Sequence, residues 1–169
     1  MKHDRLLSFL SAQKLFRGLD TEEIDSVRSR MEVVEVQAGT PVFLEGQAGD
    51  AWYVVVSGAI VILKATSAGA DHELARLERG EEFGEMALID DAPRLASAMA
   101  EGTATLARLP RSAFRALLDD EPAVGGKLVL AMARVLCQRQ RELTAVVTDL
   151  VDDPETAAPG AREMLSLLL

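Results

Sequence analysis

The sequence predicts a mainly β domain, an antiparallel sandwich or barrel, with helices before and after it. Between residues 32 and 109, apolar residues alternate with polar or small ones, as at Val34 and Val36, which is the period of a half-buried strand. Glycines recur at short intervals through the same region, as expected for turns between many short strands. These glycines stand at positions 39, 46, 49, 58, 69, 80 and 84.

Two helices are predicted before the strands. Apolar residues recur at helical spacing over residues 6–16, and residues 21–31 form a second helical pattern. Asp20 or Thr21 is expected to cap the second helix, because a short side-chain oxygen at that position can accept from the free N–H groups of the first turn.

The predicted strands differ in their expected burial. Residues 59–63 are apolar throughout and are expected to form a central strand, whereas residues 67–71 are expected to form a hairpin loop. Further strands are expected at residues 73–77, 95–100 and 103–109.

Two helices are predicted after the strands. A short one is expected at residues 111–118, and Pro122 opens a longer one that reaches residue 147, since acidic residues and a proline favour a helix start. We therefore place one domain at residues 1–147, followed by an acidic linker and an apolar tail at residues 148–169.

The long C-terminal helix carries an apolar stripe at coiled-coil spacing. Such a stripe can pair with a second copy to give a homodimer, or it can pack on the helix's own domain. Arg139 interrupts the stripe, which favours packing on the domain, and both alternatives stay open. The stripe consists of Val129, Met132, Leu136, Leu143 and Val146.

Composition limits the possible settings and partners. The chain has 169 residues and a formal net charge of −9, which disfavours unaided binding to nucleic acid phosphates. Its single cysteine, Cys137, cannot form an intramolecular disulfide, which fits a reducing, cytoplasmic setting. We expect no signal peptide and no membrane segment, because no apolar run approaches the about 18 residues that a membrane helix needs.

No constellation of catalytic or metal-binding residues is evident in the sequence. The two histidines, His3 and His72, do not form a His-x-His pair, so a metal site of the cupin kind lacks ligands. Ser57 and Ser97 have no evident base partner for nucleophilic catalysis. We therefore expect a protein that is not an enzyme and that binds no metal.

The most informative part of the chain comprises residues 83–88, Phe-Gly-Glu-Met-Ala-Leu, and residues 93–97, Pro-Arg-Leu-Ala-Ser. It sets Glu85 and Arg94 nine positions apart, with Gly84 beside the acid. An arginine can bind a phosphate through two parallel N–H groups, and a carboxylate can accept from a hydroxyl. Alternatively, the two residues could form a surface salt bridge with each other, worth about 0–1 kcal/mol. Four acidic residues nearby are expected to be solvated loop charges: Glu81, Glu82, Asp90 and Asp91.

These two segments resemble the phosphate-binding cassette of the cyclic nucleotide-binding domain family. That family includes the sensor domain of the catabolite activator protein and the regulatory subunits of cyclic-AMP-dependent protein kinase. Residues 41–50 and 52–58 are similar to the family's early strands and turns, and the resemblance covers roughly residues 15–143. It implies a jelly-roll β-barrel (a double-stranded β-helix) with N-terminal helices and two C-terminal helices.

The resemblance also implies a cyclic nucleotide as the ligand. Arg94 would clamp the cyclic phosphate, and Glu85 would accept from the ribose 2′-hydroxyl. The backbone N–H groups of residues 84–87 and of Leu95 would assist at the start of a helix. The expected ligand-binding residues are Phe83, Gly84, Glu85, Met86, Ala87, Arg94, Leu95 and Ala96.

By the same resemblance, the long C-terminal helix would close over the base, with Arg134, Val135 and Gln138 as lid residues. Leu95 stands where the family more often has a small or hydroxyl-bearing residue. Its side chain offers no hydroxyl to guanine, so cAMP is expected to be preferred over cGMP. Three apolar residues of the cassette are expected to pack in the core rather than on the ligand: Phe83, Met86 and Leu88.

We therefore expect a non-catalytic cAMP sensor that transmits occupancy through its C-terminal helix. Two alternatives remain: a ligandless interaction or dimerisation module of the same fold, and a regulatory fragment of a larger channel, transporter or enzyme. Only about twenty residues follow the long helix. That is too few for the winged helix-turn-helix of family members that regulate transcription, so no DNA-binding module is expected in this chain.

Overall fold

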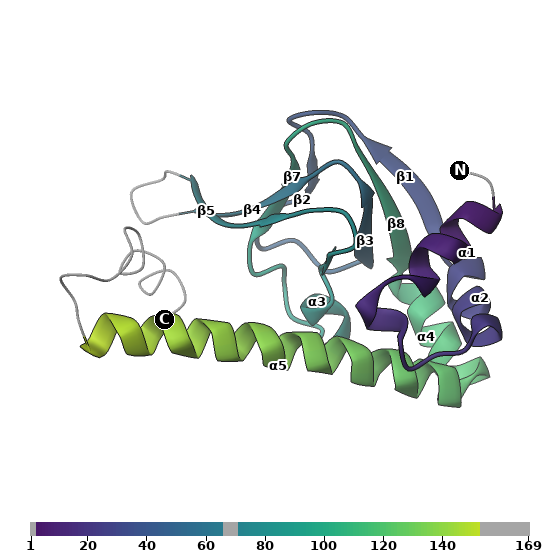
Figure 1. Ribbon diagram of the computed structural model, residues 1–169. Helices are drawn as coiled ribbons and strands as arrows, with labels where there is room; N and C mark the ends of the chain where they lie inside the picture. The colour runs from purple at the N-terminus through teal and green to yellow at the C-terminus, as the bar shows by residue number, and fades with distance from the viewer. Residues whose placement is uncertain (1–2, 66–70, 153–169) are drawn as a thin grey trace.

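The computed structural model describes residues 3–65 and 71–152, and its fold is mainly β with flanking helices (Figure 1). The strands form two antiparallel four-stranded sheets, one in the order β1-β8-β3-β6 and the other in the order β2-β7-β4-β5. The two sheets face each other as a jelly roll that hydrogen bonds do not close into a continuous barrel, and the predicted fold class is confirmed. The strands are β1 (Glu32–Val36), β2 (Pro41–Phe43), β3 (Ala51–Ser57), β4 (Ile60–Ala65), β5 (Asp71–Leu77), β6 (Glu82–Phe83), β7 (Ser97–Ala100) and β8 (Ala104–Pro110).

The helices flank the sheets at the N- and C-terminal parts of the chain, and one short helix lies within the strand region (Figure 1). The first predicted helix is broken in two, because Gln13 adopts an extended backbone conformation between the pieces. Asp20, and not Thr21, caps α2: its carboxylate accepts from the Glu23 N–H while the Glu23 carboxylate accepts from the Asp20 N–H. The helices are α1 (His3–Ser11), the 3₁₀ helix η1 (Lys14–Phe16), α2 (Thr21–Ser29), α3 (Met86–Ile89), α4 (Arg111–Asp120) and α5 (Pro122–Asp152).

Alternate residues of β3 belong to two separate cores, because successive side chains of a strand point to opposite faces. Trp52 and Val54 pack with the flanking helices in one core, which we call the helix-side core. Tyr53 and Val55 pack between the two sheets in the other. Residues 51–56 are consequently all buried, and only Ser57 of β3 is exposed.

The strand predicted to be central is β4, which is hydrogen-bonded to β5 on one side and β7 on the other. Only Ile60 of β4 is buried, whereas residues 61–63 are half-buried and Ala65 is exposed. Residues 66–70 of the predicted hairpin loop lie outside the described residues, and Asp71 already belongs to β5.

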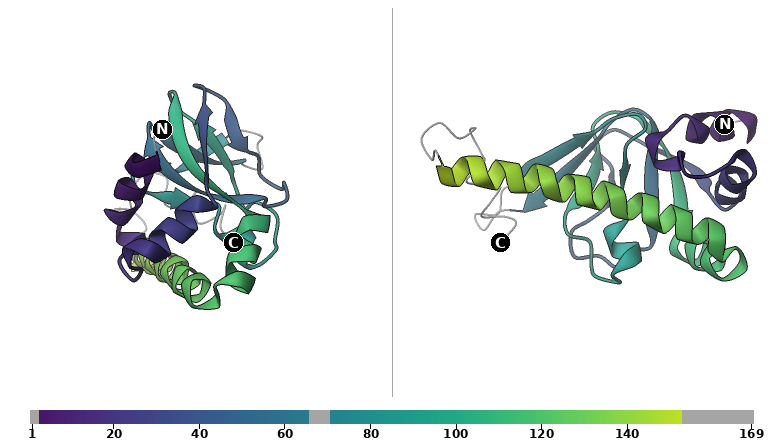
Figure 2. Two further views of the ribbon diagram at one scale, coloured as in Figure 1. Left: turned by 90° about the vertical axis from the view of Figure 1, so that its right-hand side faces the viewer. Right: turned by 60° about the horizontal axis from the view of Figure 1, so that its bottom comes forward.

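The C-terminal helices follow the prediction, except that α5 is longer than expected. It has 31 residues, about 46 Å at 1.5 Å per residue, and runs along the whole domain (Figure 2). It passes the expected boundary at residue 147 because acidic residues do not break a helix, and the first helix-breaking residue is Pro154. Residues 153–169, with most of the predicted linker and tail, lie outside the described residues.

The apolar stripe of α5 is divided in its packing. Met132 is fully buried in the helix-side core, and Val129 packs against that core. Leu143 and Val146, beyond Arg139, are only half-buried. The first half of the stripe therefore packs on its own domain, whereas the second half keeps apolar surface available.

Candidate functional site

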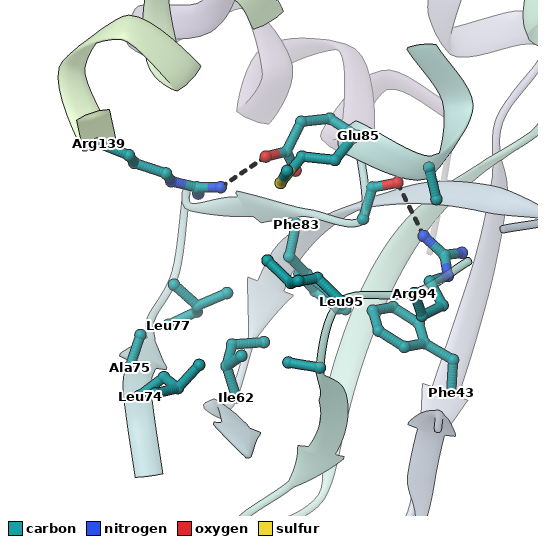
Figure 3. A pocket seen from close by; sticks show the side chains of 14 residues that line it. Phe43, Ile62, Leu74, Ala75, Leu77, Phe83, Glu85, Arg94, Leu95 and Arg139 are labelled. Carbon is teal, nitrogen blue, oxygen red and sulfur yellow. Dashed lines mark hydrogen bonds and ion pairs between the residues drawn. The ribbon is translucent and has the colours of Figure 1, made fainter. Parts of the chain in front are cut away.

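A pocket of about 230 Å³ opens beside the cassette, and we call it the cassette pocket. All eight residues predicted to bind the ligand line it, so the structure brings the whole predicted set together (Figure 3). The rest of its lining was not predicted from the sequence. These further residues are Phe43 of β2, Ile62 of β4, Leu74, Ala75 and Leu77 of β5, and Arg139 of α5.

Arg94 is a buried cation whose guanidinium is fixed by the backbone around it. Nη1 donates to the Gly84 carbonyl at 2.8 Å, and Nη2 donates to the Ala51 carbonyl at 2.7 Å. The guanidinium carbon lies 4.0 Å from the centre of the Phe43 ring, a distance suited to a cation–π contact. Its Nε is buried and has no hydrogen-bond partner among the described residues. Arg94 thus keeps a donor that no described residue uses.

Asp50 joins Arg94 to a second arginine. Its carboxylate lies 3.1 Å from Arg94 Nη2 and 2.9 Å from Arg108 Nη2. Burial alone would raise the pKa of Asp50, but the hydrogen bonds and charges of Arg108 and Arg94 outweigh it, so the pKa lies below its usual value. Asp50 is therefore a stable counter-ion that partly neutralises Arg94.

Glu85 is buried, with 2% of its side chain exposed, and its partner is Arg139 of α5. Arg139 Nη1 donates to Glu85 Oε1 at 2.7 Å (Figure 3). Arg139 Nη2 donates to the Glu82 carbonyl at 2.6 Å. Glu85 Oε2 is buried without a partner among the described residues. The alternative of a surface salt bridge between Glu85 and Arg94 is therefore wrong, because both are buried and each pairs with a different residue.

The sequence did not predict that Arg139 belongs to the site. Its only signal was an arginine inside an otherwise apolar stripe. That signal correctly indicated packing on the domain, but the partner lies 54 positions earlier in the chain. The side chain of Arg139 is 40% exposed, so it reaches the buried Glu85 from the surface.

The three predicted lid residues do not line the cassette pocket. Arg134, Val135 and Gln138 line a separate depression of about 220 Å³ together with Lys14 and Arg17, which we call the N-terminal hollow. They lie where α5 meets η1, and Arg139 is the residue with which α5 reaches the cassette pocket. Contact of the three with a base stays a prediction.

Two glycines let the backbone around the cassette come close. Gly84 has φ +82°, and a Cβ there would lie 2.6 Å from Arg94 Nη1. A Cβ on Gly49 would lie 2.3 Å from the Cβ of Ala87. Real Cβ atoms do not approach other atoms so closely. Any other residue at either position would therefore displace Arg94 or Ala87 of the cassette.

The apolar residues of the cassette divide between core and surface. Phe83 stacks on Tyr53 with a centroid distance of 5.1 Å, and Leu88 belongs to the helix-side core. Met86 is 43% exposed and Leu95 is 52% exposed. The expectation that Met86 packs in the core is wrong, because α3 is a single turn that presents Met86 to the pocket mouth.

Glu82 is not the solvated loop charge that the sequence indicated. It belongs to β6, is 7% exposed, and its carboxyl group makes no hydrogen bond or ion pair with another described side chain. Burial raises its pKa to about 7, with Glu85 and Glu81 adding to the rise and Arg139 opposing it.

Glu82 makes the stability of the domain depend on pH. The folded protein holds this proton to a higher pH than the unfolded chain does, so its free energy of unfolding decreases as pH rises from about 4.5 through about 7. The loss is about 3 kcal/mol at most, at 1.36 kcal/mol per pKa unit. Chemical denaturation at pH 5 and pH 8 should show this loss relative to Glu82→Gln. An equal pH dependence in both proteins would contradict the assignment.

Residues 3–65 and 71–152 hold neither a candidate metal site nor a candidate membrane-spanning helix. No group of three or more His, Cys, Asp or Glu side chains in these ranges could hold a metal ion. No helix in this part of the chain is long and apolar enough to cross a membrane.

Comparison with known proteins identifies the family. A family model described as cyclic nucleotide-binding domain matches residues 33–121. The cyclic AMP receptor protein of Thermus thermophilus is 35% identical over 159 residues, which cover 94% of this chain and 71% of that protein. The chain belongs to the cyclic nucleotide-binding domain family, as the resemblance of its cassette predicted.

Two further relatives are regulatory proteins of kinases. A cAMP-dependent protein kinase regulatory subunit of Mucor circinelloides is 37% identical over 110 residues, 65% of this chain and 26% of that protein. The regulatory domain of Toxoplasma gondii PKA, solved with cAMP, has a TM-score of 0.67 at 27% identity, covering 78% of this chain and 50% of that chain. The chain is thus a cyclic nucleotide-binding regulatory domain similar to those of the receptor protein and the kinase subunits, and it spans about a quarter of the Mucor subunit's length.

Proposed function

We propose that this chain is a non-catalytic sensor that binds cAMP in the cassette pocket. The observation that carries the proposal is the pair of buried, unpartnered polar atoms on residues that line this pocket, Arg94 Nε and Glu85 Oε2. One is a donor on a cation and the other is an acceptor on a carboxylate. A 3′,5′-cyclic nucleotide presents the complementary groups, an anionic phosphate and a free 2′-hydroxyl.

Each polar residue of the pocket has a distinct role in this proposal. Arg94 donates to an exocyclic phosphate oxygen, and Asp50 and the carbonyls of Gly84 and Ala51 hold its guanidinium in place. Glu85 accepts from the ribose 2′-hydroxyl. Met86 and Ala87 open α3, where first-turn N–H groups lack intrahelical acceptors and can face the phosphate. Because α3 is a single turn, these individual N–H groups matter more than a helix dipole.

We expect cAMP to bind more tightly than cGMP. Leu95 lines the pocket and is half exposed, yet it has no hydroxyl that could pair with the guanine amino group. Calorimetric titration with the two nucleotides measures the difference, and Leu95→Thr should narrow it. Equal or reversed preference in the wild-type protein would contradict this part of the proposal, and absence of saturable binding of either nucleotide would favour a ligandless interaction module.

Transmission of the signal is proposed to use Arg139. It ties α5 to Glu85 and to the backbone of β6 at once. A ligand that engages Glu85 therefore changes the free energy of one position of α5 relative to others, which is what a population shift requires. The likeness to receptor and kinase regulatory proteins supports an output on a partner or on further domains, including those of a larger channel, transporter or enzyme.

We also propose that the free half of the α5 stripe forms a homodimer. Val146→Asp should weaken it, because the stripe beyond Arg139 is only half-buried and does not belong to the domain core. Ala145→Asp is the matched control, since it adds the same charge at an exposed position on the same turn. Sedimentation at micromolar concentration, with and without cAMP, measures the mass. A monomer under both conditions would show that the stripe serves the domain alone.

The cytoplasm is the proposed setting. Cys137 is a free, exposed thiol, and such thiols persist in a reducing compartment.

A further inference from the structure

Glu82 is a buried carboxyl group that the proposed nucleotide contacts do not use. It pairs across the sheet with Val54, whose side chain belongs to the helix-side core. The next residue, Phe83, belongs to the core between the sheets and lines the cassette pocket. Glu82 therefore lies between the sheet and the helix layer, behind the pocket wall.

Arg139 of α5 holds two neighbouring glutamates at this point, one by its carboxylate and the other by its backbone. Arg139 contacts Glu85 through its side chain and Glu82 through the backbone carbonyl, and its charge lowers the pKa of Glu82. Glu85 and Glu81 act in the opposite direction. Arg79, in the turn before β6, is engaged elsewhere, with the Val56 carbonyl and the ring of Phe9.

We propose that Glu82 positions Arg139 and takes up a proton when a cyclic nucleotide binds, so that affinity for the nucleotide falls as pH rises. The inference rests on the proposed function. When Glu82 is neutral, Arg139 forms its ion pair with Glu85 alone. When Glu82 is ionised, its carboxylate attracts the same guanidinium and repels the Glu85 carboxylate. The ligand brings one more negative charge into the pocket in front of Glu82, so the bound state favours the neutral carboxyl.

Glu82 can gain or lose its proton near neutral pH, because burial already raises its pKa to about 7. If binding raises this pKa by about one unit, affinity should be about 3- to 10-fold higher at pH 6 than at pH 8.5. By the same linkage, binding at pH 7.5 should take up about half a proton.

Calorimetric titration with cAMP at pH 7.5, in several buffers of different ionisation enthalpy, counts the protons taken up. The wild-type protein should take up about half a proton. Glu82→Gln keeps the shape of the side chain but cannot ionise. It should take up none, and at pH 8.5 it should bind cAMP about as tightly as the wild type binds at pH 6. If Glu82 had only a structural role, Glu82→Gln would not restore at pH 8.5 the affinity for cAMP that the wild type has at pH 6.

His72 is the matched control, since His72→Gln also replaces an ionisable side chain by glutamine and His72 does not line the pocket. His72→Gln should keep the wild-type proton uptake. Saturable binding of cAMP without proton uptake, or uptake that persists in Glu82→Gln, would overturn the inference while leaving the proposed function intact. Absence of saturable binding by the wild type would instead overturn the proposed function, and the inference with it.

Discussion

Arg94→Ala should nearly abolish binding of cAMP. Truncating one partner of a buried, hydrogen-bonded charge pair costs about 2–5 kcal/mol, which is roughly 30- to several-thousand-fold in affinity. The structure adds a reason for the upper part of this range, since the guanidinium is 2% exposed and already fixed before any ligand binds. Calorimetric titration of the variant with cAMP measures the loss, and wild-type affinity would refute the assignment of the cassette.

Two further variants separate the loss of the phosphate contact from damage to the cassette. Arg94→Lys keeps the charge but loses the planar fork, so it should bind more weakly than wild type and more tightly than Arg94→Ala. Arg108→Ala removes the other partner of Asp50 without removing a pocket residue. It should lose much less affinity. A loss as large as that of Arg94→Ala would assign the effect to the Asp50 network.

Glu85→Ala should weaken binding of cAMP by about 1.5–3 kcal/mol, the range for a hydrogen bond to a charged group, or about 10- to 150-fold. The reason is the loss of the carboxylate that accepts from the ribose 2′-hydroxyl. The same variant should hardly change binding of 2′-deoxy-cAMP, which lacks that hydroxyl. Titration of both proteins with both ligands completes the comparison.

The two ligands also distinguish the possible roles of Glu85. Glu85→Ala frees Arg139, which is exposed enough for water to solvate its charge. If the two ligands lose affinity equally, Glu85 acts by holding α5 through Arg139 and does not read the ribose.

The cassette could be recognised by its resemblance to the family because the residues that carry this resemblance are close together in the chain. Phe83 to Ala96 form a nearly continuous segment, and Gly84 marks the point at which the backbone must come close to Arg94. Strands, turns and the cap at Asp20 also followed from patterns a few residues long. All eight predicted residues consequently line one pocket.

Contacts between distant parts of the chain could not be predicted in this way. Which turn of α5 meets the pocket depends on how Val124 and Leu128 seat the helix in the helix-side core, and one turn of helix is about 5.4 Å. The lid was therefore expected at residues that lie over η1, whereas Arg139 enters the site. Glu82 seemed a loop charge because three of its neighbours are acidic or glycine, and only the tertiary packing of β6 buries it.

The N-terminal hollow is a second place, apart from the cassette pocket, at which a bound molecule would contact α5. Three cations border it, Lys14, Arg17 and Arg134, and the last of these stands five residues before Arg139 on the same continuous helix. Under the proposed transmission, a molecule bound to η1 and α5 at this place would favour one position of α5, and so would a nucleotide that engages Glu85. Thermodynamic reciprocity then requires that each change the affinity of the other by the same factor. Occupancy of the N-terminal hollow would therefore change the affinity for the nucleotide, and nucleotide binding would change the affinity for the molecule in the hollow.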